Sequence, residues 1–497
     1  MDGKQTALII GAGTGGIATS IFLAQRGFKV DVYEKNIAAG GRCGNFVRDG
    51  HRFDVGATMV LMPEVYRDVF NSLGLNLEKD LLMKPLDDIY TLWFDDGTSL
   101  AFTTDRKRME QQHERIEPGS SARALKYVET GFRLYTMAFA KLLGRNFTRF
   151  FDFFNLGNAL LLVKLKTYIR HYNYTARFFR SEHLRMAYTF QNIYVGQSPF
   201  SAPALFSMIP AAELTEGSMF PAGGMYSVVE KLMTKAAEMG VRFHFAMPVR
   251  QISVNGRRAT GVIFSDGSEA KADVIVANAD LPYVYRELLP PGRKSRRIER
   301  MKYSCSALVL HWALDKQYPQ LGHHSTFLSD SYREGLDKIF IDKSMGDDPC
   351  FYIHAPVRTD PSAAPEGCDT LSVAVGVGHL DPRHPQNWDR ITDKARSAVF
   401  RKLKKIGIED IEEHIKFEII TAPETWVEAL NVSRGSVFGS IGHNILQMGW
   451  FRPHNRDHRY GNLYFTGGST HPGNGIPMVL LSARLVSERI ISEQKRD

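Results

Sequence analysis

The chain has 497 residues, 43% of them apolar and 23% charged, and a net charge of +8, which is the composition of an ordinary globular protein. Its length exceeds what one hydrophobic core usually supports, so two or three lobes are expected. The four cysteines (Cys43, Cys305, Cys350, Cys368) show no CxxC motif and no metal-ligand spacing, which argues against a disulfide framework and favours a reducing compartment. No apolar run of about 18 uncharged residues is present, so no spanning helix is predicted. The N-terminus passes directly into the first predicted strand, which leaves no room for a signal peptide.

The first element is a strand–loop–helix–strand unit. Ala7 to Ile10 reads as a buried parallel strand, the glycine-rich residues 11–16 as a loop, and Ile17 to Gln25 as a helix. A second strand, Val30 to Tyr33, ends at Glu34. This order, with an acid about twenty residues after the glycines, predicts a dinucleotide-binding unit.

Each glycine of the G-x-G-x-x-G motif has a separate task. Gly11 allows a tight turn, Gly13 admits a pyrophosphate close to the backbone, and Gly16 lets helix and strand approach. Glu34 suits the ribose hydroxyls and disfavours a 2′-phosphate, which argues against NADP. The alternative is an ordinary glycine-rich turn between a strand and a helix.

A second motif follows that unit. Residues 39–42 read Ala-Gly-Gly-Arg and residues 53–57 read Phe-Asp-Val-Gly-Ala. A glycine pair with an arginine at this place resembles the extended FAD fingerprint of flavoprotein oxidases and dehydrogenases. The planar guanidinium of Arg42 suits diphosphate or flavin carbonyl oxygens. An arginine in a solvated turn is the alternative.

The middle of the chain alternates between sheet and helix patterns. Residues 86–105 predict a hairpin around Asp95-Asp96-Gly97, and residues 108–215 read as helical. Strands and a hairpin at Asn255-Gly256 follow, and residues 272–280 read as a buried strand that ends in a loop. Residues 300–420 predict a separate lobe, with strands at 306–312, 351–354 and 371–377 and a helix at 391–405.

Residues 133–185 are both basic and aromatic. They contain ten Lys or Arg residues against only Asp152 and Glu182, and they include the run FTRFFDFFNLGNALLLVKLKTYIRHYNYTARFF. Cations on long stems around bulky apolar residues suit a helix in a lipid interface. A helical core with a solvated basic face is the main alternative. Nucleic acid is disfavoured because no recognised binding module accompanies the pattern.

The C-terminal segment repeats the strand–glycine–helix theme. Residues 462–469 read as a strand running into Gly467-Gly468, and residues 471–478 form a loop before a helix from Val479 to about Ser492. A helix N-terminus can direct N–H groups and the positive end of its dipole at an electron-rich flavin edge. We therefore expect both ends of the chain to meet on one FAD.

Several longer blocks resemble the bacterial and fungal phytoene desaturase family, a branch of the FAD amine oxidase-like flavoproteins. The resemblance covers essentially the whole chain and is carried by FPAGGMYSVVEKL, HAPVRTDPSAAPEGC, WFRPHNRD and NLYFTGGSTHPGNGIPMVLLSARL. At 471–479 this chain has HPGNGIPMV, where many phytoene desaturases have HPGAGIPGV. Variants of this kind resemble C30 desaturases, terminal carotenoid oxidases or later-step desaturases, so the resemblance leaves the substrate open.

The resemblance implies an α/β fold: a Rossmann-like FAD-binding domain of glutathione-reductase/amine-oxidase type, an inserted α+β substrate domain, and a helical membrane-associating region. The implied boundaries are 1–85, 217–298 and 421–497 for the first, 86–107 and 299–420 for the second, and 108–216 for the third. The predicted FAD-binding residues are Gly11, Gly13, Gly15, Gly16, Glu34, Lys35, Gly41, Arg42, Gly56, Ala57, Thr58, Val249, Gly467, Gly468, Gly475, Ile476, Pro477 and Met478.

The implied chemistry is desaturation of an apolar C30 or C40 polyene, with a hydride passing to the flavin. The proton acceptor is unassigned; His471, Glu129 and Glu216 are candidates, although a histidine beside Pro-Gly is more often structural. Oxygen or a membrane quinone is the expected electron acceptor. The expected location is the cytoplasmic side of a membrane, with peripheral attachment. A carotenoid oxidase or isomerase and a non-catalytic flavin-binding lipid carrier are the alternative functions.

The adjacent residues His323 and His324 raise the question of a metal site. Neighbouring residues on a strand point to opposite faces of the sheet, so the two rings are not expected to share an ion. The sequence therefore predicts no metal.

Overall fold

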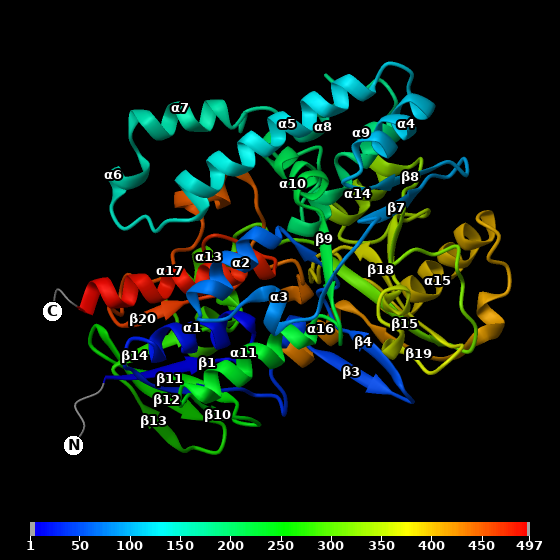
Figure 1. Ribbon diagram of the computed structural model, residues 1–497. Helices are drawn as coiled ribbons and strands as arrows, with labels where there is room; N and C mark the ends of the chain where they lie inside the picture. The colour runs from blue at the N-terminus through cyan, green and yellow to red at the C-terminus, as the bar shows by residue number, and fades with distance from the viewer. Residues whose placement is uncertain (1–4, 495–497) are drawn as a thin grey trace.

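The computed structural model describes residues 5–494 and contains two large sheets beneath a layer of helices (Figure 1). The first sheet is parallel throughout and lies beside both chain ends. Its strands, in spatial order, are β10 (Arg242–His244), β2 (Lys29–Tyr33), β1 (Thr6–Ile10), β14 (Val274–Ala277) and β20 (Leu463–Phe465). Both the predicted N-terminal unit and the predicted C-terminal strand thus belong to one sheet.

Alternation along β1 places the parallel sheet between two layers. Ala7 and Ile9 pack with apolar residues of the helices, whereas Leu8 and Ile10 pack with a three-stranded antiparallel sheet. The helices of this domain are α1 (Thr14–Ala24), α2 (Pro63–Ser72), α3 (Leu77–Asp80), α11 (Tyr226–Glu238) and α17 (Ile476–Gln494). The antiparallel sheet is formed by β11 (Val249–Asn255), β12 (Arg258–Phe264) and β13 (Glu269–Lys271), and its first hairpin turns at Asn255-Gly256 as predicted.

The second large sheet is mixed and has seven strands. Their spatial order is β19 (Ile415–Thr421), β15 (Ser306–Leu314), β18 (Asp369–Val377), β17 (Phe351–His354), β16 (His324–Phe327), β7 (Tyr90–Trp93) and β8 (Ser99–Phe102). Helix α15 (Trp388–Lys405) packs its apolar face on this sheet, because residues of α15 share one core with β15 and β18. The predicted strands of residues 300–420 and the predicted hairpin of residues 86–105 are confirmed, although β15 runs two residues beyond its predicted end.

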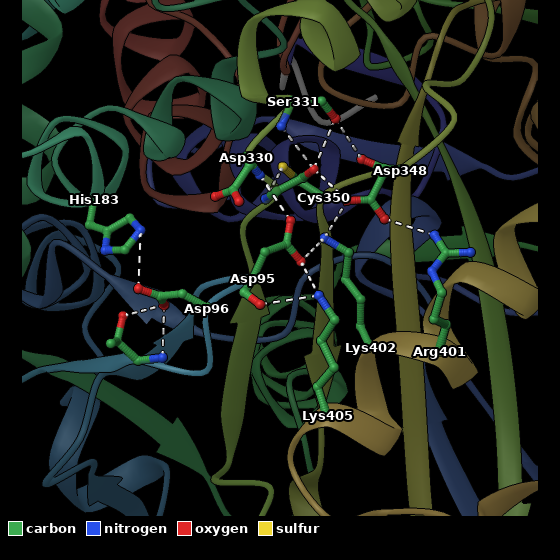
Figure 2. A network of polar contacts seen from close by, with 12 residues as sticks. Asp95, Asp96, His183, Asp330, Ser331, Asp348, Cys350, Arg401, Lys402 and Lys405 are labelled. Carbon is green, nitrogen blue, oxygen red and sulfur yellow. Dashed lines mark hydrogen bonds and ion pairs between the residues drawn. The ribbon is translucent and has the colours of Figure 1, made fainter.

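A buried lysine ties the tip of the β7–β8 hairpin to α15 (Figure 2). Lys402 is only 3% exposed and its Nζ lies 2.9 Å from Asp95 Oδ1 and 3.0 Å from Asp348 Oδ2. Arg401 also pairs with Asp348, at 2.8 Å. Burial alone raises the pKa of Asp348, but hydrogen bonds from Ser329, Lys402 and Arg401 outweigh it and lower the pKa. The network fixes the hairpin against the helix on one side of the second sheet.

Smaller elements connect the two large sheets. The remaining strands are β3 (Asn45–Arg48), β4 (His51–Asp54), β5 (Val60–Leu61), β6 (Met83–Pro85) and β9 (Ser218–Pro221). The connecting helices are α12 (Leu281–Tyr283), α13 (Arg293–Glu299), α14 (Tyr332–Phe340) and α16 (Pro423–Leu430). The boundaries of the three predicted regions stay predictions.

The helical layer covers the upper side of the molecule in Figure 1. It contains α4 (Arg106–Ile116), α5 (Ser121–Ala138), α6 (Phe150–Phe153), α7 (Leu156–Lys164), α8 (His171–Thr175), α9 (Glu182–Ala187) and α10 (Met208–Glu216). Helix α5 packs closely against α10, where an added Cβ on Gly131 lies 2.6 Å from Ala211. Among the described residues, no helix is both long and apolar enough to cross a bilayer.

The basic aromatic stretch divides into two parts. Tyr127, Phe179 and Tyr188 form a buried aromatic cluster with ring centroids 4.8–5.9 Å apart, so these aromatic residues build the core. In α6 and α7, by contrast, Phe151 and Leu156 are exposed. The interpretation of the whole stretch as interfacial therefore does not hold at Phe179, which packs in a core with Tyr127 and Tyr188 just outside the stretch. Leu160, Val163 and Tyr168, earlier in the same stretch, are exposed.

Candidate functional site

A cavity of about 540 Å³ lies where the parallel sheet, the second sheet and the helical layer meet. One part of its wall is made of glycine loops and charged side chains at the carboxyl ends of β1, β2 and β14. The other part is made of apolar side chains from the helical layer and the second sheet. Ligands of open parallel sheets bind at this end of the strands, so the cavity is the candidate site.

The glycine loop after β1 has the close backbone approaches that its sequence predicts. Gly11 has a φ of +97°, and a Cβ on Gly16 would lie 2.2 Å from the carbonyl oxygen of Gly11. A Cβ on Gly13 would lie 2.8 Å from Asn278 Oδ1. Gly11, Gly13 and Gly15 line the cavity, whereas Gly16 does not, because it joins α1 to the loop. This close approach of helix and loop is the task predicted for Gly16 from the motif, and its contact with the cofactor stays a prediction.

Glu34 is fixed at the end of β2 by two backbone donors. Its Oε2 accepts a hydrogen bond from the Ala12 N–H at 2.8 Å, and its Oε1 accepts one from the Asn36 N–H at 3.0 Å. The carboxylate is buried in the cavity wall beside the glycine loop. This position is the one that binds a ribose in a dinucleotide fold.

Lys35 and Val249 complete this end of the cavity. The Nζ of Lys35 donates to the carbonyl oxygen of Glu428 at 2.8 Å and to Asn431 Oδ1 at 3.1 Å, so Lys35 ties β2 to the end of α16. Both residues line the cavity.

Arg42 places a cation inside the wall. Its Nη1 donates to the Val437 carbonyl oxygen at 2.9 Å, and its Nη2 lies 3.2 Å from where a Cβ on Gly468 would be. Burial lowers the pKa of Arg42, and the nearby Asp280 carboxylate counteracts part of that effect. A guanidinium so placed can accept an anionic phosphate or a flavin oxygen.

The C-terminal loop lines the cavity next to the first glycines, where a Cβ on Gly15 would lie 2.9 Å from Val479 Cγ1. Residues 466–469 and 474–479 line it, and α17 begins there at Ile476. Arg452 holds the loop from behind, because its Nε donates to the Thr470 carbonyl at 2.8 Å and its Nη2 to the Gly468 carbonyl at 2.7 Å. Arg452 is fully buried, which lowers its pKa to about 9. It does not line the cavity, so it fixes the loop.

The remaining predicted residues also reach the site. Gly41, Gly56, Ala57, Thr58, Gly467, Gly475, Pro477 and Met478 line the cavity. Sequence reasoning missed several polar residues of the wall, among them Asn36, Asp54, Asn278 and Asp280. Asn278 and Asp280 follow β14 in the loop that ends the predicted segment 272–280, and the loop after a parallel strand is the signal that could have identified them.

The candidate proton acceptors do not lie at the cavity. His471 is buried and its Nε2 lies 3.1 Å from the Arg145 carbonyl, and burial lowers its pKa to about 4. Glu129 is exposed on α5, and Glu216 lies at the end of α10. None of the three is part of the cavity wall, so the geometry gives no support to them as groups that touch the substrate, and the proton acceptor stays a prediction.

The wall contains buried polar atoms that a bound dinucleotide can satisfy. Tyr66 Oη, Asp280 Oδ1 and Asn474 Oδ1 have no hydrogen-bond partner among residues 5–494, and all three residues line the cavity. Buried polar groups are rarely left unpaired in folded proteins. Together with the glycine loops and Arg42, these atoms fit an FAD molecule.

The rest of the wall is apolar. From the segment after β4 and from the helical layer come Met59, Leu61, Met62, Phe139, Ile193, Val195, Phe206, Met208 and Ile209. The second sheet contributes Ala307, Val309 and Val375. An apolar wall that adjoins a dinucleotide cradle suits a hydrophobic substrate.

A buried acid near this wall gives a pH-dependent stability. Glu213 on α10 accepts a hydrogen bond from Tyr90 Oη at 2.6 Å, and burial raises its pKa to about 8. The folded protein therefore keeps a proton that the unfolded chain loses near pH 4.5. Stability falls as the pH rises from about 4.5 to about 8 and is level above that range.

Glu213→Gln should remove this dependence. We expect the variant to be as stable as the wild type at pH 5. At pH 8 its free energy of unfolding should exceed that of the wild type by about 3 kcal/mol. Denaturant titrations at both pH values measure the difference. Glu129→Gln, on the exposed face of α5, is the control and should follow the wild type. Parallel wild-type and Glu213→Gln profiles would contradict the raised pKa.

A dinucleotide cradle built from both ends of the chain and joined to an apolar chamber defines a flavin-dependent oxidoreductase. The family model for flavin containing amine oxidoreductase matches residues 14–491. The "zeta-carotene-forming phytoene desaturase" of Myxococcus xanthus is 39% identical to this chain, and the alignment covers 98% of this chain and 93% of the relative. The "Phytoene desaturase" of Fusarium fujikuroi is 35% identical, and the alignment covers 99% of this chain and 90% of the relative.

Solved structures show the same fold at low sequence identity. An oxidoreductase from Methanosarcina mazei has a TM-score of 0.65 at 14% identity, over 97% of this chain and 100% of that one. Putrescine oxidase has a TM-score of 0.62 at 14% identity, over 98% and 99%. The chain therefore belongs to the flavin-containing amine oxidoreductase family. Its relatives at 39% and 35% identity place it with the phytoene desaturases of that family. It is an FAD-dependent oxidoreductase.

Proposed function

We propose that this protein desaturates a long apolar polyene, phytoene or a related C30 or C40 carotenoid precursor. The observation that carries the proposal is that a single cavity joins the dinucleotide cradle to an apolar chamber. A polyene has no polar handle, so its recognition rests on burial of apolar surface against such a wall. The phytoene desaturases named among the relatives support the same assignment.

In the proposed reaction, neighbouring saturated carbons lose a hydride and a proton. FAD, when bound, supplies the hydride acceptor. Residues such as Met208 and Ile209 hold the chain and exclude water, while Arg42 and the N-terminus of α17 favour negative charge at the cradle. Asp54 also lines the cavity, and burial raises its pKa to about 7, so it can take up a proton near neutral pH. Oxygen or a membrane quinone is the proposed final electron acceptor.

Terminal oxygenation of a carotenoid is the second candidate function. Asn474 donates through Nδ2 to the Tyr194 carbonyl at 2.8 Å, while its Oδ1 is unpartnered among the described residues and the residue lines the cavity. This polar atom lies in the motif that departs from the usual HPGAGIPGV. A relative named "4,4'-diapolycopene oxygenase", from Methylomonas sp, is 30% identical over 99% of both chains.

Expression in a phytoene-producing host tests the proposal. Liquid chromatography with absorption detection should show products that absorb at longer wavelengths than phytoene, and their mass should fall by two hydrogens per step. A parallel host that supplies C30 precursors measures chain-length preference. Products with added oxygen would favour the oxygenase. Unchanged pigments in both hosts, with the flavin bound, would contradict desaturation and favour a flavin-binding lipid carrier.

We also propose that the protein docks on a lipid surface through the segment of α6 and α7, which stands out from the body at the upper left of Figure 1. Phe151 and Leu156 on this segment are exposed. Phe150 and Phe154 pack against Trp450, with ring centroids 6.0–6.1 Å apart, and the loop that contains Trp450 also carries exposed Leu446. The segment shares a core with the cavity wall residues Phe206 and Ile209. A polyene could thus pass from lipid to the chamber, with the protein on the cytoplasmic side of the membrane.

A further inference from the structure

Three buried histidines meet where β16 begins and β17 ends, within the second sheet and outside the cavity. His324 in β16 pairs in register with His354 in β17, so both side chains lie on the same face. His323 immediately precedes β16, and its ring centroid lies 4.4 Å from that of His324 and 5.0 Å from that of His354. The expectation that the neighbouring rings point apart is wrong, because strand alternation starts only at His324.

The arrangement leaves one nitrogen of each ring without a partner. His323 Nδ1 lies 2.6 Å from Thr359 Oγ1, and His324 Nδ1 lies 2.6 Å from Tyr352 Oη. The Nε2 atoms of His323, His324 and His354 are buried and have no hydrogen-bond partner within residues 5–494. Three such atoms in one place need an explanation, because a buried polar atom left unpaired destabilises the folded state and is rare in proteins.

We propose that His323, His324 and His354 form a binding site for a nitrogen-preferring transition-metal ion such as Zn²⁺. One ring nitrogen from each residue lies within 4.8 Å of the other two. A zinc ion with nitrogen ligands at about 2.0–2.1 Å leaves those ligands roughly 3.3 Å apart, a distance that small ring rotations reach. The hydroxyls of Thr359 and Tyr352 lie within hydrogen-bond distance of the Nδ1 atoms, and when they accept from Nδ1–H the tautomer of each ring offers Nε2 to the metal.

The surroundings favour neutral rings and exclude other cations. Burial lowers the pKa of His323 to about 3, with a contribution from Arg358, and also lowers the pKa values of His324 and His354. Neutral imidazole is the form that binds a metal. The nearby Arg358 is paired with Asp369 at 2.6 Å, which offsets part of its charge. No carboxylate belongs to this group of described residues, so Mg²⁺ and Ca²⁺ are disfavoured.

The metal would stiffen the wall of the cavity. Tyr352 lines the cavity, and its Oη lies 2.8 Å from Thr58 Oγ1 and 2.6 Å from His324 Nδ1. An ion on His324 Nε2 thus fixes the orientation of a residue that faces the bound molecule. The role is positional and involves no electron transfer.

Zinc content tests the proposal in the intact flavoprotein. The purified holoprotein is dialysed against Zn²⁺, passed over chelating resin and measured by inductively coupled plasma mass spectrometry. We expect about one zinc ion per chain in the wild type and at least tenfold less in His323→Asn, His324→Asn and His354→Asn. At positions 323 and 324, asparagine keeps a polar group near the position of Nδ1 and removes Nε2.

His51→Asn is the matched control. His51 is also buried, with Nδ1 bonded to Thr370 and Nε2 unpartnered among the described residues, but it lies outside the cluster. It should retain the wild-type zinc content. X-ray absorption at the zinc edge of the wild type should show imidazole nitrogens at about 2.0 Å, which decides the matter even when a variant misfolds. Wild-type protein without zinc, variants with as much zinc as the wild type, or an absorption spectrum without imidazole would each overturn the site.

Discussion

Gly16→Ala should purify without bound flavin. The added Cβ would lie 2.2 Å from the Gly11 carbonyl oxygen and 3.0 Å from Asn278 Oδ1. A backbone oxygen cannot rotate away, so α1 must move from the loop and carry its N-terminal N–H groups out of position. A displacement cost of about 3 kcal/mol corresponds to roughly 100-fold weaker FAD binding. The ratio of flavin to protein absorbance and a reconstitution titration with FAD measure the effect.

Gly335→Ala provides the control. Gly335 lies inside α14, and a Cβ there would meet no atom within 4 Å. Alanine is favoured over glycine in a helix interior by up to about 1 kcal/mol, so this variant should keep its flavin and its stability. Yellow Gly16→Ala protein with wild-type FAD affinity would show that the loop does not hold the dinucleotide.

The N-terminal cradle could be predicted because its determinants are local. Gly11, Gly16 and Glu34 belong to one strand–loop–helix–strand unit, where spacing alone fixes the geometry. The wall residue Asn278 illustrates the limit of such reasoning. Asn278 lies 265 positions after Gly13 in the sequence, and the two residues meet only because β14 pairs with β1. No local sequence pattern predicts that pairing.

Side-chain direction and burial were predicted less well. A carboxylate such as Glu129 is a chemically suitable proton acceptor, but its position on α5 places it on the exposed face of the helix. The three-histidine cluster depends on the register between β16 and β17, which brings His354 opposite His324 across 30 positions of sequence. Composition also could not separate the core residue Phe179 from the exposed Phe151.

Replacement of the apolar residues exposed on α6 and α7 by serine should abolish most binding to lipid vesicles. Leu156, Leu160 and Val163 recur at helical spacing on one face of α7 and are 76%, 55% and 58% exposed, while Leu161 on the opposite face is 4% exposed. Phe151 on α6 is 78% exposed. Partial burial of each side chain in lipid contributes about 1 kcal/mol, so the fourfold serine variant should bind roughly 100- to 1000-fold more weakly. Flotation with phosphatidylcholine–phosphatidylglycerol vesicles measures this loss.

The control replaces Ile37, Leu82 and Ile341, which are similarly exposed but lie in connecting segments elsewhere in the chain. A threefold serine variant there should bind vesicles as the wild type does, because scattered exposed apolar residues are ordinary on a protein surface. Lys164→Gln with Lys166→Gln should weaken binding only to anionic vesicles and only at low salt, by about 1 kcal/mol per charge. Equal vesicle binding by the α6–α7 variant and the control would show that lipid meets another face, and the path from this segment to the chamber would then lose its entrance.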